Sequence, residues 1–311
     1  ADLGRARRRW HMPDTIPLDI QHDAPIETWF GIGGTADRLA RPTSVDELIQ
    51  CLELDANLRI LGDGANLLVG DGGVRELVVS LERLDSVSIE TTGIVRAQAG
   101  TNLMRLVQDT ARAGLAGLHT LAGVPASVGG AVCMNAGGTY GNTFDHLVEV
   151  TTLDRLGIIH TQSASDFHPT YRNGGIGDRI VVEAVFKLTP TETEDVRATL
   201  KRIMAEKKAS QPLSADSAGC VFKNPTLTRD IDGIGSAGDR VSAGMLIDRA
   251  GCKGMRLGGA SVSERHANFM VVEKSNARAQ DVIDLIAQVQ DIVLRRFGTE
   301  LETEVVIWGA A

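Results

Sequence analysis

The 311-residue chain contains few of the residues that cross-link secreted proteins or bind catalytic metals. Its four cysteines form no Cys-x-x-Cys pair and lack the dense spacing of a disulfide scaffold. We therefore expect free thiols and a reducing, cytoplasmic location. The seven histidines include no His-Glu-x-x-His pair and no His/Asp cluster, so we expect no metal site.

The chain also lacks long apolar runs and an excess of positive charge. No run approaches the roughly 20 residues that cross a bilayer. Lys and Arg number 32 against 40 Asp and Glu, and the net charge of -8 has the wrong sign for general attraction to nucleic acid or acidic membranes. The basic cluster Arg5 to Arg9 is not followed by the apolar stretch of a secretory signal, and we expect residues 1–13 to form a mobile arm.

Hydrophobic residues and glycine are plentiful, and 43% hydrophobic content can fill the core of two or three lobes. The pattern of strand-like and helix-like segments indicates an α+β or an α/β fold with many turns. We expect a first lobe at residues 14–82, a second at 83–210 and a third at 211–302. A last strand within residues 303–311 is expected to return to the second lobe.

Local signals mark several elements of these lobes. Short apolar runs predict strands at residues 59–61, 77–79 and 180–182. A capping-box pattern opens a helix at residues 44–47, and a second helix is expected to open at residues 191–194. The longest helix is predicted after Asn276, and Gly298 is expected to close it.

One glycine segment, residues 60–68, reads as a strand followed by a glycine turn. Successive backbone N–H groups in such a turn can bind an anion such as a pyrophosphate. The segment is neither a G-x-G-x-x-G fingerprint, because Leu67 stands in place of the third glycine, nor a Walker A loop. An ordinary β-turn explains it equally well.

A second glycine segment, residues 121–138, favours a ligand site. It is too apolar for a solvent loop and too interrupted by glycine for a regular helix or strand, so we expect it to lie against something flat. Two such segments some sixty residues apart predict a nucleotide clamped between the first two lobes.

Across Thr28 to Gly309 the chain resembles the UDP-N-acetylenolpyruvoylglucosamine reductases, flavoproteins with the vanillyl-alcohol-oxidase type of FAD-binding fold. Only about thirty residues separate Leu188 from Cys220, as in the shorter, second type of this family. The resemblance rests on the order and spacing of residues 28–34, 62–68, 122–130, 135–137, 171–172, 217–225, 244–248, 258–263, 266–269 and 301–305.

The resemblance implies two α/β lobes that clamp FAD and a C-terminal α/β lobe that binds a UDP-sugar. It also implies a monomeric enzyme that reduces an enolpyruvyl ether with hydride from NADPH through FAD. The cofactor-binding residues that it implies are Gly62, Gly64, Ala65, Asn66, Leu67, Gly123, Val124, Pro125, Ser127, Gly129, Gly130, Asn135, Ala136 and Gly137.

Three catalytic residues follow from the same resemblance. Arg172 matches the family's catalytic arginine, and its planar, permanently charged group suits a carboxylate that gains charge. Cys220 stands where the first type carries a serine proton donor. Glu304 matches the catalytic glutamate, with Glu302 as the nearest competitor, because two residues along a strand share a face.

The implied substrate-side residues are Tyr171, Lys223, Asn224, His266 and Asn268. A phosphate-binding lysine is Lys207 or Lys208, and the spacing does not decide between them. Two other functions are compatible with the glycine segments. One is an FAD-dependent oxidase or dehydrogenase of the same fold that acts on an alcohol or sugar; the other is a nucleotide-binding module without turnover.

Overall fold

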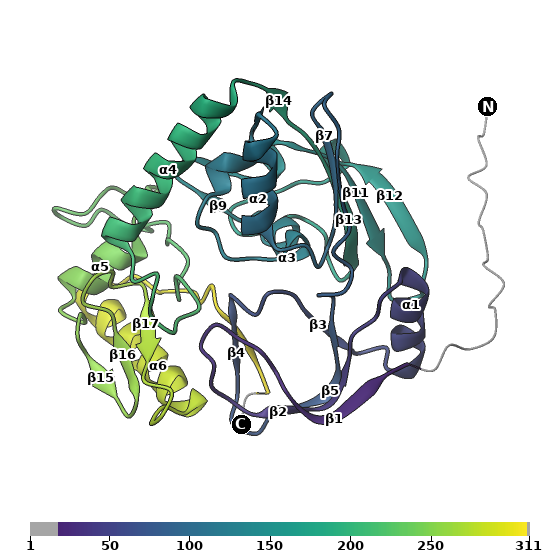
Figure 1. The fold of residues 1–311 in the computed structure, drawn as a ribbon. Helices are drawn as coiled ribbons and strands as arrows, with labels where there is room; N and C mark the ends of the chain where they lie inside the picture. The colour runs from purple at the N-terminus through teal and green to yellow at the C-terminus, as the bar shows by residue number, and fades with distance from the viewer. Residues whose placement is uncertain (1–17, 310–311) are drawn as a thin grey trace, which may run out of the picture.

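The computed structural model describes residues 18–309, so the arm predicted at residues 1–13 lies outside the described residues. Figure 1 shows the purple N-terminal strands below the teal strands of a larger sheet, with the green and yellow C-terminal elements to the left. The elements therefore form three groups in space, which follow the chain order except at the C-terminus.

The first lobe is built on a four-stranded sheet in the order β1-β2-β5-β3. Its strands are β1 (Ile20–Pro25), β2 (Thr35–Ala40), β5 (Val74–Ser80) and β3 (Arg59–Leu61). Only β1 and β2 pair antiparallel. The predicted strands at residues 59–61 and 77–79 lie within β3 and β5.

Helix α1 (Val45–Leu54) begins at the predicted capping residue. The Ser44 side chain accepts a hydrogen bond from the Glu47 amide at 3.2 Å. Glu47 reaches back to the Thr43 amide at 2.6 Å, one residue before the position of a standard capping box. These bonds satisfy one of the free N–H groups of the helix start and the amide of the residue before the cap.

The second lobe contains a five-stranded antiparallel sheet in the order β12-β11-β13-β7-β6. These strands are β6 (Val87–Ile89), β7 (Ile94–Gln98), β11 (Leu147–Leu153), β12 (Ile159–Ser163) and β13 (Ile180–Lys187).

Helices α2 (Leu103–Arg112) and α3 (Val128–Cys133) cover one face of this sheet, and α4 (Thr193–Ser210) runs beside them (Figure 1). The shorter elements of the lobe are β8 (Leu115–Ala116), η1 (Leu118–Leu121), β9 (Gly137–Gly138), β10 (Gly141–Asn142), η2 (Thr143–Asp145), η3 (Ala164–Asp166) and β14 (Thr189–Pro190).

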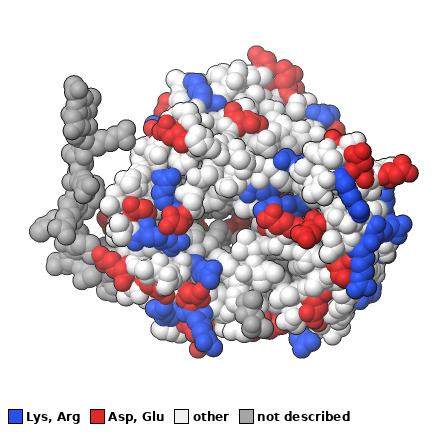
Figure 2. All heavy atoms as spheres, turned by 180° about the vertical axis from the view of Figure 1, so that it is seen from behind, with Lys and Arg blue, Asp and Glu red and all other residues white. Residues whose placement is uncertain are grey.

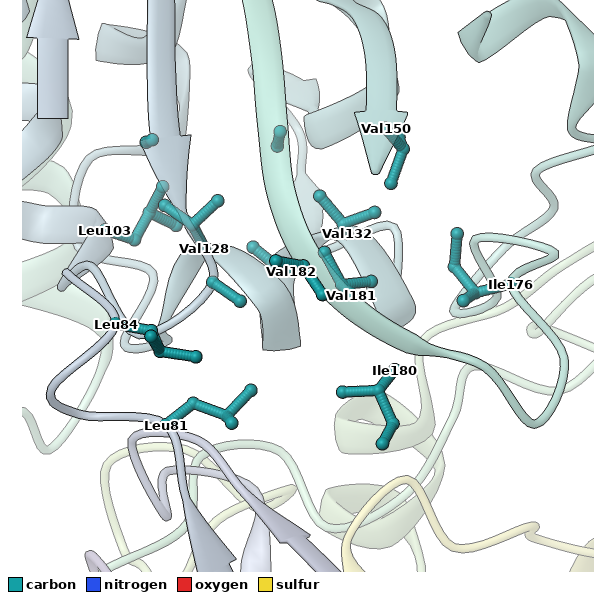
Figure 3. Close-up of a cluster of buried hydrophobic side chains, with 14 of the residues drawn as sticks. Leu81, Leu84, Leu103, Val128, Val132, Val150, Ile176, Ile180, Val181 and Val182 are labelled. Atoms are coloured by element: carbon teal, nitrogen blue, oxygen red, sulfur yellow. The ribbon is translucent and has the colours of Figure 1, made fainter. Parts of the chain in front are cut away.

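Helix α3 corrects the expectation that the second glycine segment forms no regular structure. The Ser127 side chain caps the helix by accepting a hydrogen bond from the Gly130 amide at 3.2 Å. Figure 3 shows Val128 and Val132 of this helix beside Val181 and Val182 of β13. Burial of each such side chain stabilises the folded state by about 1.5–3 kcal/mol. This offsets the low helix propensity of Gly129 and Gly130.

The first and second lobes share one hydrophobic core. Leu48 of α1 and Leu77 of β5 belong to the same buried cluster as Val95 of β7 and Leu106 of α2. The division predicted at residue 82 therefore separates two sheets but does not separate two independent cores.

The third lobe contains α5 (Ala243–Arg249), α6 (Ala279–Phe297) and a small sheet of β15 (Arg256–Leu257), β16 (Ala260–Val262) and β17 (Met270–Val272). The predicted longest helix is α6, and Gly298 ends it with a left-handed φ of 63°. The hydrophobic core of the third lobe includes Phe30 and Leu68 of the first lobe, so the first and third lobes also pack together.

The C-terminal strand β18 (Val306–Trp308) pairs in parallel with β4 (Leu67–Val69). The prediction that it returns to the second lobe is wrong, because β4 belongs to the first lobe. The physical reason is burial: Trp308 packs in the cluster that contains Val69 and Val78.

A side-chain cap also joins the first and third lobes. Asp71 accepts hydrogen bonds from the Ala279 and Gln280 amides, at 2.9 and 3.1 Å, and so caps the N-terminus of α6 from outside the helix. A carboxylate at this end also interacts favourably with the helix dipole. Within residues 18–309, no helix combines the length and apolar character needed to span a membrane.

Candidate active site

Residues from all three lobes line a cavity of about 520 Å³. Seen from behind, the molecule is hollowed near its centre, and side chains of both charges lie at the rim (Figure 2). Arg172, Cys220 and Glu304 line this cavity together, as do all the predicted cofactor-binding residues except Asn135.

The two glycine segments meet at one wall of the cavity. A Cβ atom added to Gly62 would lie 2.6 Å from Ser127 Oγ, and one added to Gly129 would lie 2.9 Å from the Cβ of Ala99. Bare main chain therefore lines this wall, where a side chain would collide. Such a surface allows close approach of a flat ring and of phosphates, so the residues present fit an FAD molecule.

Asp63, within the first glycine segment, was not singled out from the sequence. It accepts hydrogen bonds from Trp29 Nε1 at 3.1 Å and from Asn102 Nδ2 at 3.5 Å. Burial raises the pKa of this carboxyl group. Asp63 also borders a second cavity of about 110 Å³, which the ion-paired Arg41 and Glu82 also line.

Asn135 does not line the cavity but holds neighbouring segments in place through its side-chain hydrogen bonds. Its side chain accepts a hydrogen bond from the Phe144 amide at 3.2 Å and donates one to the Thr170 carbonyl at 3.3 Å. Asn135 thus holds the turn that carries Arg172, and this turn is closed by backbone hydrogen bonds between Thr170 and Asn173.

Arg172 adopts a left-handed backbone conformation, with φ of 60°. This costs a non-glycine residue on the order of 1–3 kcal/mol and is found mainly where the surroundings fix a functional side chain. Its Nη1 donates to the Gly137 carbonyl at 3.0 Å, and its Nε lies 2.6 Å from Glu304 Oε1. The Nε–H bond does not point at that oxygen, so the contact is an ion pair and not a directed hydrogen bond.

Glu304 is held by two backbone contacts. Its amide donates to the Val221 carbonyl at 2.7 Å, and its carbonyl accepts from Asn66 Nδ2 at 2.9 Å. Asn66, predicted as a cofactor residue, therefore also positions Glu304. Burial raises the pKa of the Glu304 carboxyl, and the Arg172 charge opposes that rise.

Glu302 does not share the face of Glu304, contrary to expectation. Its side chain is 73% exposed and pairs with Lys223 Nζ at 2.5 Å, whereas that of Glu304 is 13% exposed. The alternation expected of a strand fails because the regular strand begins only at Val306. The structure therefore places Glu304, and not Glu302, at the cavity.

Burial raises the pKa of the Cys220 thiol to about 12, and the nearby Glu304 carboxylate adds to this rise. The positive charges of Arg172 and Lys207 act in the opposite direction. A thiol with such a pKa is protonated at neutral pH, as a proton donor must be.

The five predicted substrate-side residues do not line this cavity. Tyr171 lies just outside it: its hydroxyl accepts from the Asn224 amide at 3.2 Å, and the Arg240 guanidinium lies 4.4 Å from the centre of its ring. Asn268 is buried and hydrogen-bonds the Phe222 amide and carbonyl, at 2.9 and 2.8 Å.

The other two predicted substrate-side residues, His266 and Lys223, lie in the third lobe, as Asn268 does. The ring of His266 packs edge-on against Phe269, and Lys223 pairs with Glu302. Of the two lysines that the spacing left open, Lys207 lines the cavity and Lys208 does not.

Sequence reasoning missed three further residues that line the cavity, Arg155, Asp178 and Arg179. No local pattern marks them. Arg155 donates to the Asp178 carbonyl at 3.0 Å, so the folding of the sheet brings them together.

The family model of the UDP-N-acetylenolpyruvoylglucosamine reductase C-terminal domain matches residues 211–308, and a model of an FAD-binding domain matches residues 36–163. The reductase of Moorella thermoacetica is 42% identical over 301 residues, which cover 94% of this chain and 95% of that protein. The chain belongs to the UDP-N-acetylenolpyruvoylglucosamine reductase family.

Other members of this reductase family agree. The reductase of Parvibaculum lavamentivorans is 39% identical over 92% of this chain and 90% of its own length. The crystal structure of the reductase from Thermus caldophilus superposes with a TM-score of 0.77 at 35% identity, and covers 94% of this chain and 99% of that one. The predicted family and the mixed α+β, FAD-binding fold are thus confirmed.

Proposed function

We propose that Arg172, Cys220 and Glu304 carry the reaction of this reductase family in the cavity where the three lobes meet. As a member of the family, the chain is an FAD-dependent oxidoreductase. It reduces UDP-N-acetylglucosamine enolpyruvate to UDP-N-acetylmuramate, a step in peptidoglycan precursor synthesis, with NADPH as hydride donor. The observation that carries the proposal is that these three residues, far apart in sequence, line one cavity with both glycine segments.

The glycine segments would hold FAD. Backbone N–H groups around Gly62 and Gly64 suit the pyrophosphate, and the bare main chain of residues 123–130 suits a flat ring. When bound, FAD supplies the hydride that one olefinic carbon of the substrate receives.

Arg172 and Glu304 would control charge on the substrate. Arrival of hydride at one carbon moves electron density toward the substrate carboxylate, and a fixed cation there stabilises the developing charge. Arg172 is already held, by its left-handed backbone and by its contacts to Gly137 and Glu304, so little reorganisation is needed. The Glu304 carboxylate would keep the Arg172 guanidinium in place through the ion pair at its Nε atom.

Cys220 would deliver the proton to the neighbouring carbon. Its raised pKa keeps the thiol protonated before reaction, and the carbanion-like carbon is a far stronger base than a thiolate. The S–H bond breaks, a C–H bond forms, and the sulfur keeps the electron pair.

We further propose that the UDP part of the substrate extends from the cavity toward Tyr171, Lys223, Asn224, His266 and Asn268. Lys223 and Arg240 supply positive charge there, although Lys223 must first leave its ion pair with Glu302. We also propose that the enzyme is a cytoplasmic monomer that binds neither membranes nor nucleic acid.

Anaerobic reduction tests the function directly. NADPH should bleach the flavin absorbance of the holoenzyme, and the UDP-enolpyruvyl sugar should restore it with one product formed per flavin. Restoration only by oxygen, with peroxide formed from an alcohol or sugar, would instead identify an oxidase of the same fold.

A further inference from the structure

Lys207 of α4 is held at the cavity by the second glycine segment. Gly123 has a left-handed φ of 71°, and a Cβ atom added there would lie 2.9 Å from Lys207 Cδ and 3.1 Å from Met204 Sδ. The lysine stem therefore crosses the bare main chain of Gly123. Its side chain reaches the cavity that Cys220, Arg172 and Glu304 also line.

Within the described part of the chain, the ammonium group of Lys207 has no acidic partner. Among residues 18–309 it forms neither a hydrogen bond nor a salt bridge, and the neighbouring Glu206 pairs with Arg202 instead. Burial lowers the pKa of Lys207, and the Arg172 charge lowers it further. An amine in this position gives up a proton more readily than a lysine in water.

The proposed reaction creates a need for such a group. Each turnover leaves a thiolate at Cys220, which must regain a proton before the next. The thiol is half-buried in the cavity wall, where bound FAD and product would restrict the access of bulk water.

The groups that affect the pKa of the Cys220 thiol are Glu304, Arg172, Asn268 and Lys207. The guanidinium group of an arginine and the amide group of an asparagine do not act as acids in proteins, and Glu304 is ion-paired with Arg172. Lys207 is the remaining acid among them.

We propose that Lys207 returns the proton to the Cys220 thiolate after each turnover. The proposal rests on the function proposed above. An Nζ–H bond of Lys207 breaks and the S–H bond of Cys220 re-forms, in direct contact or through one water. The neutral amine then takes a proton from solvent, so no oxidant or reductant is consumed.

The direction of this transfer follows from the two environments. The thiol pKa is raised to about 12, whereas the lysine pKa is lowered from its usual value, so the proton moves downhill from nitrogen to sulfur. Since the ammonium form is the donor, steady-state turnover should decline as the pH rises through the lysine pKa. Lys207 thereby differs from a phosphate-binding lysine, whose loss weakens substrate binding.

The test compares one turnover with many. In Lys207→Ala holoenzyme reduced by NADPH, the first addition of UDP-enolpyruvyl sugar should reoxidise the flavin at the wild-type rate, because the thiol is already protonated. Steady-state kcat should then fall about 10²-fold, after a burst of one product per enzyme. Ethylamine should restore kcat in proportion to its protonated fraction, and Lys201→Ala, on the exposed part of the same helix, should behave as wild type.

Two results would overturn the proposal. A raised KM with unchanged kcat would identify Lys207 as a phosphate ligand, and a slow first turnover would place it in the chemical step itself. Flavin reduction by NADPH at the normal rate shows that each variant is folded. Failure of the substrate to reoxidise wild-type flavin would instead reject the proposed function.

Discussion

The two walls of the cavity are built in different ways. The glycine wall, residues 62–67 and 123–137, presents mainly main chain and small side chains from the first two lobes. The ionisable wall presents Arg172, Lys207, Cys220 and Glu304, which come from a turn, a helix and two extended segments. The first wall is suited to hold a ligand by shape, and the second to move charge and protons.

This difference separates the expected effects of mutation. Changes in the glycine wall should weaken FAD binding and leave the chemistry of bound FAD largely intact. Changes in the ionisable wall should leave FAD bound and slow the transfer to substrate. The predictions below test this separation, from the largest expected effect to the smallest.

Cys220→Ala should slow flavin reoxidation by the UDP-enolpyruvyl sugar by about 10²–10⁴-fold, because the proton donor is lost. Flavin reduction by NADPH should keep its wild-type rate, since that step needs no proton from the thiol. Stopped-flow absorbance measures both half-reactions. Cys220→Ser should recover part of the loss, and an unchanged reoxidation rate in Cys220→Ala would remove this residue from the mechanism.

Glu304→Gln should lower the same rate by about tenfold or more, because it removes the carboxylate that fixes Arg172. Glu302→Gln is the matched control: its exposed ion pair with Lys223 is worth little, and an effect below about threefold is expected. If Glu302→Gln proved the more damaging change, the wrong carboxylate would have been assigned.

Gly62→Ala should weaken FAD binding by about 1–3 kcal/mol, because the new methyl group collides with Ser127 Oγ. Fluorescence titration of the apoenzyme with FAD measures this loss. Gly72→Ala provides the control, since no atom lies within 4 Å of the Cβ that it would add. Equal FAD affinity in both variants would argue against the glycine wall as the FAD site.

Asp71→Ala should lower the free energy of unfolding by about 0.5–2 kcal/mol, because α6 loses its N-terminal cap. Asp71→Asn keeps an oxygen that can accept one of the two hydrogen bonds and should recover most of this loss. Denaturant titration of the holoenzymes provides the comparison. Equal destabilisation by both substitutions would mean that the carboxylate charge, and not the cap, stabilises the contact between lobes.

Much of the fold follows from local sequence signals. The Ser44 cap of α1 and the Gly298 end of α6 were predicted because capping depends on a few neighbouring residues. The pairing of β18 with β4 was not predicted. These strands lie more than 230 positions apart, and their pairing depends on the burial of Trp308, which no local sequence pattern indicates. Helix α3 was missed because burial of its valines outweighs the low helix propensity of its glycines.

The site divides in the same way. The glycine wall was recognisable from its glycine pattern, whereas Arg172, Cys220 and Glu304 were singled out only through the family resemblance. The positioning contacts of Asn66 and Asn135 and the cavity position of Lys207 depend on the folded backbone. Their residue types alone gave no reason to expect them.

The central claim is that side chains from separate lobes act as one unit on a single bound substrate. A double-mutant cycle on the single-turnover rate of flavin reoxidation tests it, with Cys220→Ala, Glu304→Gln and the combined variant compared with wild type. We predict that the double variant is little slower than Cys220→Ala alone. If the fold loss in reoxidation rate of the double variant equalled the product of the two single losses, Cys220 and Glu304 would act independently, which would contradict the account.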